Sequence, residues 1–248
     1  MSHIKFTLVF LLLFTKIVSA QRIDLKVASI KYKVIYSANN TVLVNDICQL
    51  DITNQQSYFY SLGVKEAVRK FAIKAEQAAA SNTRVAMSEE DLLHNMFKFN
   101  TIKEYNNNRS IVLEFVGDET LGYVKDTLSN MKWEITQEVR MIDKLKCRLA
   151  KYKSGKVTVS AWFCPDIPFR DGPLFYYGLP GLIVKLENSQ GWSVDLLSVS
   201  YSGIIKEQIA IEPYRLVTNA QFKRAKKIQD AMLENGKISG GSFEKANQ

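Results

Sequence analysis

The sequence predicts a mainly β protein of the α+β class, built on a curved antiparallel sheet or half-barrel with a few covering helices. Three observations support this class. Many short runs alternate apolar and polar residues, as in residues 28–37, and turn-forming residues such as Asn106-Asn107-Asn108 separate them. Only two segments show a strong helical period. The chain of 248 residues is long enough to bury a sizeable core, and we expect one β-rich domain over residues 21–248.

Residues 1–20 have the pattern of a secretory signal. Lys5 supplies a basic start, residues 6–14 are apolar, and Val18-Ser19-Ala20 is a small-residue cleavage site. We therefore expect a mature chain that begins at Gln21 and is exported to the periplasm or the cell exterior, with a place beside the outer membrane as one option. No second apolar run is long enough to span a bilayer, so we do not expect a transmembrane protein.

The order of the elements follows from the changes in periodicity. A hairpin is expected over residues 25–60, with its turn at Ala38-Asn39-Asn40, and a helical insertion over residues 62–98. Further strands are expected between residues 96 and 211. Thr218 and Gln221 form a capping-box pattern that begins a C-terminal helix over residues 217–235.

Three cysteines, Cys48, Cys147 and Cys164, lie in a chain predicted to enter an oxidising compartment. A two-residue turn at Ser154-Gly155 would put Cys147 on the same face as Cys164, one diagonal step away. We therefore favour a Cys147–Cys164 disulfide with Cys48 free, while the other two pairings stay open. Three isolated cysteines without a CxxC motif do not predict a metal site.

The run YYGLPGLIVKLEN, residues 176–188, places two glycines and a proline directly before an alternating apolar strand. Glycine permits unusual backbone angles and proline cannot donate to a ladder, so Gly178, Pro180 and Gly181 predict an enforced bend that sets the register of the next strand. This interpretation requires no ligand. A phosphate-binding loop is excluded, because the GxxxxGK[ST] pattern is missing and a strand follows in place of a helix.

The same region resembles the GLPGLI family, named for the hexapeptide Gly178, Leu179, Pro180, Gly181, Leu182 and Ile183. The matching features run in order: Trp133, Ile142, Cys147, Ala150, Ala161-Trp162-Phe163, Ile167-Pro168, Gly172-Pro173 and the hexapeptide. The resemblance implies a secreted or envelope protein, chiefly of Bacteroidota, with no established activity and no catalytic residues to carry over. The order of strands and bend also looks like the half-barrel of periplasmic lipoprotein carriers, a likeness of fold alone.

Several classes of function are disfavoured by the residues. The net charge of +8 is spread along the chain without a dense basic stripe, so nucleic-acid binding is not expected. His94 would be the single histidine of the mature chain, so we predict no catalytic constellation, no enzyme activity and no cofactor. Cys164 as a reactive thiol, and Asp166 with Asp171 as an acid–base pair, are less favoured than structural roles.

Binding or carriage of an apolar ligand, such as a lipid, is the leading hypothesis. A curved sheet often encloses an apolar cavity, and five aromatic side chains are candidates to line it, although each fits an ordinary core role equally well. These are Trp133, Trp162, Phe163, Tyr176 and Tyr177. An envelope assembly or protein-interaction module, which would use exposed strand edges, is the alternative, and a hydrolase ranks below both.

Overall fold

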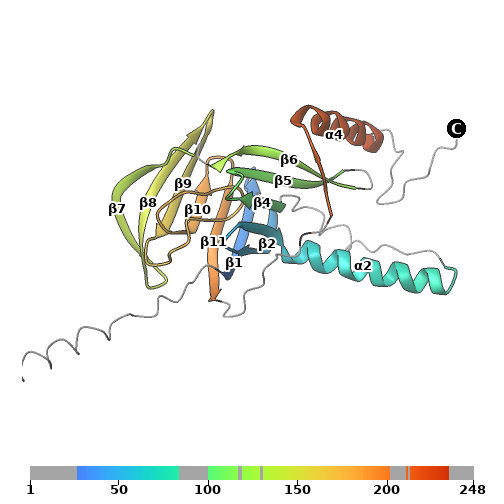
Figure 1. Ribbon diagram of the computed structural model, residues 1–248, viewed down its shortest axis with the longest axis horizontal. Helices are drawn as coiled ribbons and strands as arrows, with labels where there is room; N and C mark the ends of the chain where they lie inside the picture. Colours follow the sequence, from blue (N-terminus) through green and yellow to red (C-terminus); the bar gives the residue numbers. More distant parts are fainter. Residues whose placement is uncertain are drawn as a thin grey trace, which may run out of the picture.

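A computed structural model describes residues 27–83, 100–116, 119–128, 131–201, 211 and 213–234. These residues form one curved twelve-stranded sheet and two helices, so the predicted fold class is confirmed (Figure 1). The strands are β1 (Ala28–Ala38), β2 (Thr41–Ile52), β3 (Gln56–Ser61), β4 (Asn100–Glu104), β5 (Arg109–Val116), β6 (Glu119–Thr127), β7 (Glu134–Ile142), β8 (Leu145–Ser154), β9 (Val157–Cys164), β10 (Leu182–Asn188), β11 (Trp192–Tyr201) and β12 (Arg215–Val217). The helices are α2 (Leu62–Ala80) and α4 (Asn219–Glu234).

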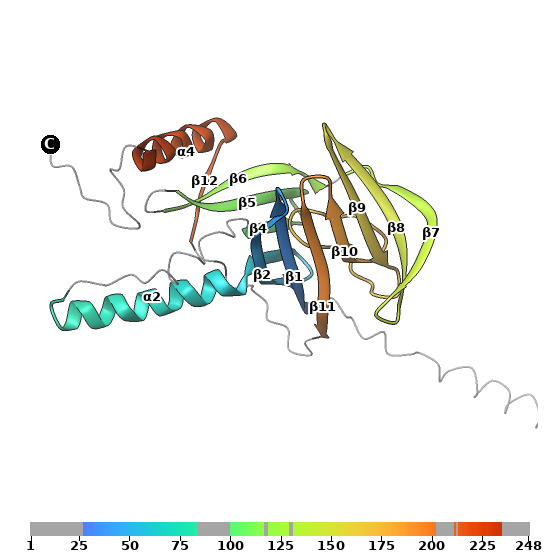
Figure 2. The ribbon, with the colours of Figure 1, turned by 180° about the vertical axis from the view of Figure 1, so that it is seen from behind.

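The strand order is β12-β6-β5-β4-β3-β2-β1-β11-β10-β9-β8-β7. From β1 the chain builds one half of the sheet outward to β6, then starts the other half at its far end with β7 and returns inward to β11. The first and the eleventh strand therefore meet in the middle of the sheet, where β1 and β11 pair antiparallel (Figure 2). Every other pair is also antiparallel except β12–β6, which is parallel.

The local hairpins follow the sequence pattern, with one correction of register. Asn39 and Asn40 both adopt left-handed backbone angles and form the predicted first turn. The β8–β9 turn lies at Gly155-Lys156, because Ser154 pairs with Val157, and not at Ser154-Gly155. Moving the turn by one residue shifts the strand pairing by two residues, which keeps every side chain on its predicted face. One step beyond the Arg148–Phe163 pair, this register places Cys147 directly opposite Cys164, and not diagonally from it.

Both helices begin at the caps that their sequences specify. The Ser61 hydroxyl accepts a hydrogen bond from the Val64 backbone nitrogen at 2.9 Å and caps α2. At α4 the Gln221 side chain accepts from the Thr218 nitrogen at 2.9 Å and the Thr218 hydroxyl accepts from the Gln221 nitrogen at 3.2 Å, which confirms the capping box. The rest of the predicted helical insertion, including His94, lies outside the described residues.

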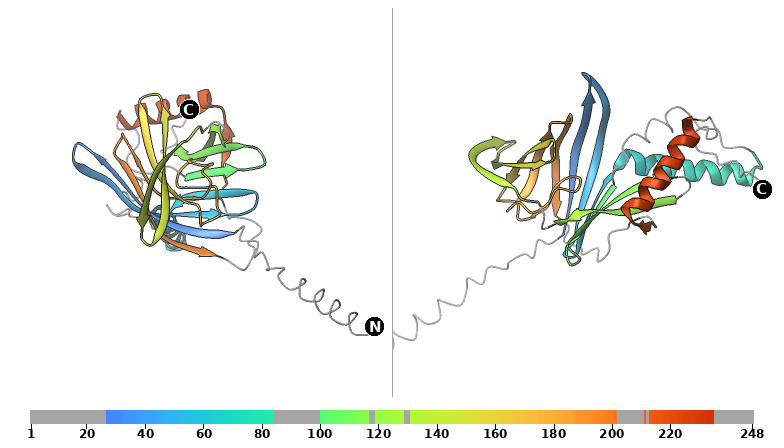
Figure 3. Two further views of the ribbon diagram at one scale, coloured as in Figure 1. Left: turned by 90° about the vertical axis from the view of Figure 1, so that its left-hand side faces the viewer. Right: turned by 90° about the horizontal axis from the view of Figure 1, so that it is seen from above.

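The main core lies on the concave face of the sheet, and the sheet curves around the segment of residues 165–181 that links β9 to β10 (Figure 3). Fully buried side chains from both halves of the sheet meet there, among them Tyr32, Phe59, Phe163 and Ile183. The concave face is thus filled in large part by the chain's own linking segment. Within the described part of the chain, no helix is long and apolar enough to cross a membrane.

Candidate functional site

The segment of residues 165–181 is held in its path by backbone geometry. Gly178 and Gly181 have φ angles of +97° and +147°, in the region that favours glycine. A Cβ at Gly181 would lie 2.2 Å from the backbone oxygen of Cys164, whereas a Cβ at Gly178 would meet nothing within 4 Å. Leu179 is buried, and so are residues 182–184, so burial does not alternate at the start of β10. The hexapeptide is therefore a bend closely packed against the end of β9.

Lys185 of β10 is only partly exposed. Its Nζ atom lies 3.0 Å from a Glu187 carboxylate oxygen and 2.8 Å from an Asp195 carboxylate oxygen, with 24 % of the side chain accessible. The two carboxylates thus keep the Lys185 ammonium close to the sheet surface.

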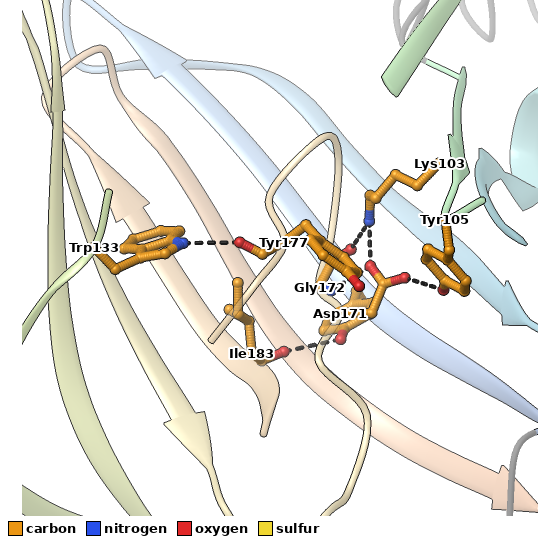
Figure 4. Close-up of polar contacts among 8 residues, drawn as sticks. Lys103, Tyr105, Trp133, Asp171, Gly172, Tyr177 and Ile183 are labelled. Atoms are coloured by element: carbon orange, nitrogen blue, oxygen red, sulfur yellow. Dashed lines mark hydrogen bonds and ion pairs between the residues drawn. The ribbon is translucent and has the colours of Figure 1, made fainter. Parts of the chain in front are cut away.

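A buried ion pair joins the segment to the opposite half of the sheet. Lys103 of β4 contacts the Asp171 carboxylate, and the two side chains are 0 % and 2 % exposed (Figure 4). Lys103 Nζ also donates to the Gly172 carbonyl oxygen at 2.6 Å, and the Tyr105 hydroxyl donates to the second Asp171 oxygen at 2.5 Å. Lys103 of β4 and Tyr105, the residue directly after β4, thereby hold the Asp171-Gly172 corner of the segment.

Burial sets the electrostatics of this group. Desolvation lowers the pKa of Lys103, and the neighbouring Asp171 carboxylate opposes that shift. Burial, followed by the Asp171 charge, raises the pKa of Tyr105 well above its usual value. The Tyr105 hydroxyl is therefore a permanent donor at neutral pH, and the charge of Lys103 depends on its partner.

Two further hydrogen bonds hold the chain that follows this corner. The buried Tyr32 hydroxyl of β1 donates to the Ile183 carbonyl oxygen at 2.8 Å. The Trp133 indole nitrogen donates to the Tyr177 carbonyl oxygen at 2.9 Å (Figure 4). A side chain of β1 and one from the residue directly before β7 thus hold the chain between Tyr177 and Ile183.

A pocket of about 180 Å³ opens beside the buried ion pair. Its walls come from the β2–β3 turn, the end of β4 and the segment, and are formed by Ile52, Thr53, Asn54, Tyr105, Pro168, Phe169, Arg170, Asp171 and Tyr177. The rings of Tyr105 and Tyr177 are stacked with centroids 5.5 Å apart. Arg170 is exposed, has no ion pair among the described residues, and donates only to the Gly178 carbonyl oxygen at 3.3 Å. The pocket combines aromatic walls with one uncompensated positive charge.

The structure brings together some of the five aromatic residues selected from the sequence and separates others. Trp133 packs 6.0 Å from Tyr176, ring to ring, and Tyr177 lines the pocket. Trp162 and Phe163 are adjacent in β9, so they point to opposite faces of the sheet. The Arg140 guanidinium covers the Trp162 ring at 4.8 Å. Trp162 and Phe163 therefore do not line a common cavity.

The cysteines are free thiols in the structure, so the predicted Cys147–Cys164 disulfide is not formed in it. Burial and the neighbouring Cys164 thiol raise the pKa of Cys147 to about 12. Cys48 is buried on β2, separated from β8 by four strands of the sheet. The described residues contain no group of three or more His, Cys, Asp or Glu side chains able to hold a metal ion.

The arrangement suits binding better than proton transfer. Lys103 is inaccessible to a ligand, and both Asp171 oxygens already accept internal hydrogen bonds, so neither is free to act as a general base toward a group in the pocket. Sequence reasoning missed Lys103, Tyr105 and Arg170 as site residues. A lysine in a strand is ordinarily exposed, and no spacing rule links Lys103 to a carboxylate 68 residues away.

A family model of unknown function matches part of the chain. Residues 80–185 match the model of a family described as "Protein of unknown function (Porph_ging)". This match includes the hexapeptide, while the narrower assignment to the GLPGLI family stays a prediction. No curated protein matches the chain.

The fold recurs in solved structures. Two structures of PNGF-II have TM-scores of 0.56 and 0.55 and 14 % and 15 % sequence identity, over 82 % and 80 % of this chain. At this identity the likeness shows the fold alone, and the chain spans about a third of the length of PNGF-II. A LolA superfamily protein from Nitrosomonas europaea aligns over 77 % of this chain and 93 % of its own, with 6 % identity and a TM-score of 0.31. That score is too low to extend the comparison to the lipoprotein carriers.

Proposed function

We propose that this protein is a binding protein, and that its ligand occupies the pocket between the β2–β3 turn and the segment of residues 165–181. The observation that carries the proposal is the stacked pair Tyr105 and Tyr177, which faces the pocket next to a buried ion pair. Aromatic walls with a few fixed polar groups are typical of ligand sites. We further propose that binding takes place in the periplasm or outside the cell, as the predicted signal segment implies.

The charge of the pocket supports a ligand with an apolar body and an acidic end. Ile52, Pro168 and the aromatic rings supply apolar contact. Lys103 and Asp171 compensate each other, so Arg170 provides the unbalanced charge. A guanidinium donates hydrogen bonds in a fixed fork that matches a carboxylate or phosphate. We therefore narrow the apolar ligand expected from the sequence to an amphiphile with an anionic end.

Rigidity also supports recognition at this pocket. The Tyr105 hydroxyl is fixed by Asp171, and the Tyr177 carbonyl oxygen accepts from Trp133. Side chains that are already ordered lose little conformational entropy on binding. The stacked rings therefore form a preorganised wall, and the affinity for a small ligand does not depend on refolding of the segment.

Octanoate and octanol test this proposal because they differ in the charge of one end. We expect saturable octanoate binding, measured by titration calorimetry, and weaker binding of octanol. Arg170→Gln should lower octanoate affinity about tenfold and leave octanol binding unchanged, whereas Tyr177→Ala should weaken both. Arg69→Gln, the same change at an exposed arginine on α2, is the matched control. Absence of saturable binding, or equal loss in Arg170→Gln and Arg69→Gln, would contradict the proposal.

A protein-interaction module is the second candidate function. It is favoured by β7, which ends the sheet and has exposed side chains along most of its length. A free strand edge can pair with a strand from another chain. This surface is separate from the pocket, so the two functions are independent.

A further inference from the structure

The two ends of the sheet are very different. At one end β12 has only three residues and runs parallel to β6, whereas at the other end β7 has nine residues and pairs with β8 on one side only. Val139 and Met141 of β7 are 50 % and 62 % exposed. A long edge strand with exposed apolar side chains is a ready partner for another strand.

The backbone of β7 has a defined set of outward-facing groups. The β7–β8 hairpin turns at Asp143-Lys144, whose φ angles of 44° and 69° fit a type I′ turn, and Ile142 pairs with Leu145. The residues that flank such a two-residue turn exchange hydrogen bonds, and the pattern then alternates along the strand. Ile142 and Arg140 therefore direct their backbone groups toward β8. Val139 and Met141 direct theirs toward the free side.

We propose that a second copy of this chain pairs antiparallel with β7 along this free edge, with the twofold axis at Val139. In this register Val139 faces Val139 of the second copy, and the two residues exchange backbone hydrogen bonds. Glu138 then faces Arg140 of the second copy, and Arg140 faces its Glu138. These charged residues occupy non-hydrogen-bonded positions, where facing side chains are closest.

Charge selects this register over its neighbours. A pairing centred on Glu138 would place two carboxylates opposite each other, and one centred on Arg140 would place two guanidinium groups opposite each other. Like charges directly opposite in a sheet are destabilising. The Val139 centre is the arrangement among these three in which opposite charges face on both sides of the axis.

The same features limit the assembly to two chains. The pairing uses an identical surface from each copy, so it forms a closed twofold contact. The far edge of each sheet is the short parallel strand β12, which offers little for further addition. The β7–β8 register is irregular between Ile135 and Val139, so the regular part of the free edge runs only from Val139 to Ile142.

Charge exchange tests the proposal in the purified protein by sedimentation equilibrium. We expect the wild type to form a concentration-dependent dimer. Glu138→Arg and Arg140→Glu should each weaken the dimer about tenfold or more, because each places like charges opposite each other. The double variant should restore the wild-type constant. Glu66→Arg on α2 is the matched control and should leave the dimer unchanged, and thermal unfolding checks that each variant folds, since Arg140 also covers Trp162.

A cross-link gives an independent positive readout. Cα atoms of a hydrogen-bonded antiparallel pair are ~5.5 Å apart, within disulfide range, so Val139→Cys should give a covalent dimer on mild oxidation. Val42→Cys, at another exposed valine, should not. A wild type that stays monomeric, or a dimer indifferent to Glu138→Arg, would overturn the proposal. Failure of the double variant to recover, with Val139→Cys not cross-linking, would overturn the register. None of these outcomes depends on the pocket.

Discussion

Lys103 and Asp171 are 68 residues apart in the chain and form an ion pair whose side chains are 0 % and 2 % exposed. Each group replaces the solvation that the other has lost, and the Asp171 carboxylate also accepts from Tyr105. A buried pair of this kind is weak evidence for net stabilisation, but breaking it leaves an uncompensated charge in the core. The position of the segment therefore depends on both Lys103 and Asp171.

We predict that Lys103→Met destabilises the protein by about 3–5 kcal/mol, because it leaves the Asp171 carboxylate buried without its cation. Combination with Asp171→Asn should recover part of that loss, since the neutral amide can still accept from Tyr105. Denaturant unfolding of the two single variants and the double variant measures the coupling. Additive losses would show that the two side chains do not act as a pair.

Valine substitutions at the two glycines of the hexapeptide should differ in effect. Gly178→Val should cost about 1–3 kcal/mol, because a β-branched residue resists positive φ although the site has open space. Gly181→Val should cost more, because its Cβ would also collide with the Cys164 oxygen. Thermal unfolding compares them. Unchanged melting temperatures together with lost octanoate binding would make the hexapeptide a recognition site in place of an architectural bend.

Buried tyrosines predict a loss of stability in alkali. Burial raises the pKa of Tyr32 and of Tyr105 well above the ordinary value of 10.0. Groups with a raised pKa in the folded state stabilise the fold below the unfolded value and lose that contribution as pH rises toward the folded value. We expect tyrosinate absorbance from these two residues to appear together with unfolding, above about pH 10. Circular dichroism along the same titration checks it, and ionisation well before unfolding would contradict the burial.

The thiols should be unreactive in the folded state. Cys48, Cys147 and Cys164 are all buried, and the pKa of Cys147 is raised to about 12. Since the thiolate is the reactive form, we expect alkylation only after denaturation. If the purified protein is oxidised, peptide mapping should link Cys147 to Cys164, which face each other in the β8–β9 register, and leave Cys48 free. A link from Cys48 to either partner would be incompatible with the sheet order.

Local features were predictable from the sequence, and the meeting of distant segments was not. The Asn39-Asn40 turn and the capping box at Thr218 depend on residues within a few positions of each other, so their patterns identify them. The pairing of β1 with β11 depends on the complementary faces of two strands far apart in the chain, which periodicity does not encode. Chain pattern alone likewise left the β8–β9 register uncertain by two residues, because that shift preserves the face of every side chain.

In the candidate site, too, the local turn was predictable from the sequence and the contact with a distant strand was not. Asp171-Gly172-Pro173 has the composition of a turn, and it does bend the chain, but its carboxylate also balances Lys103. A lysine in an alternating strand ordinarily faces water, so the fully buried Lys103 could be recognised only once the segment was seen to cover its face of the sheet. The aromatic residues selected from the sequence indicated the region of the pocket, but not which of them line it. Tyr177 lines the pocket, whereas Trp162 lies under an arginine on another face.

The central β1–β11 pair has a consequence for how the molecule is made. Ala28 pairs with Tyr201, so the two halves of the sheet cannot join until the chain has been made as far as β11. Contacts of such long sequence separation must overcome loop-closure entropy before they contribute, which places β-rich topologies among the slow folders, in milliseconds to seconds. Hairpins within each half can form early, while the bond from Tyr32 to Ile183 must wait for the union of the halves. The hairpins of the first half therefore have to persist without their central partner until the last strands of the second half are made.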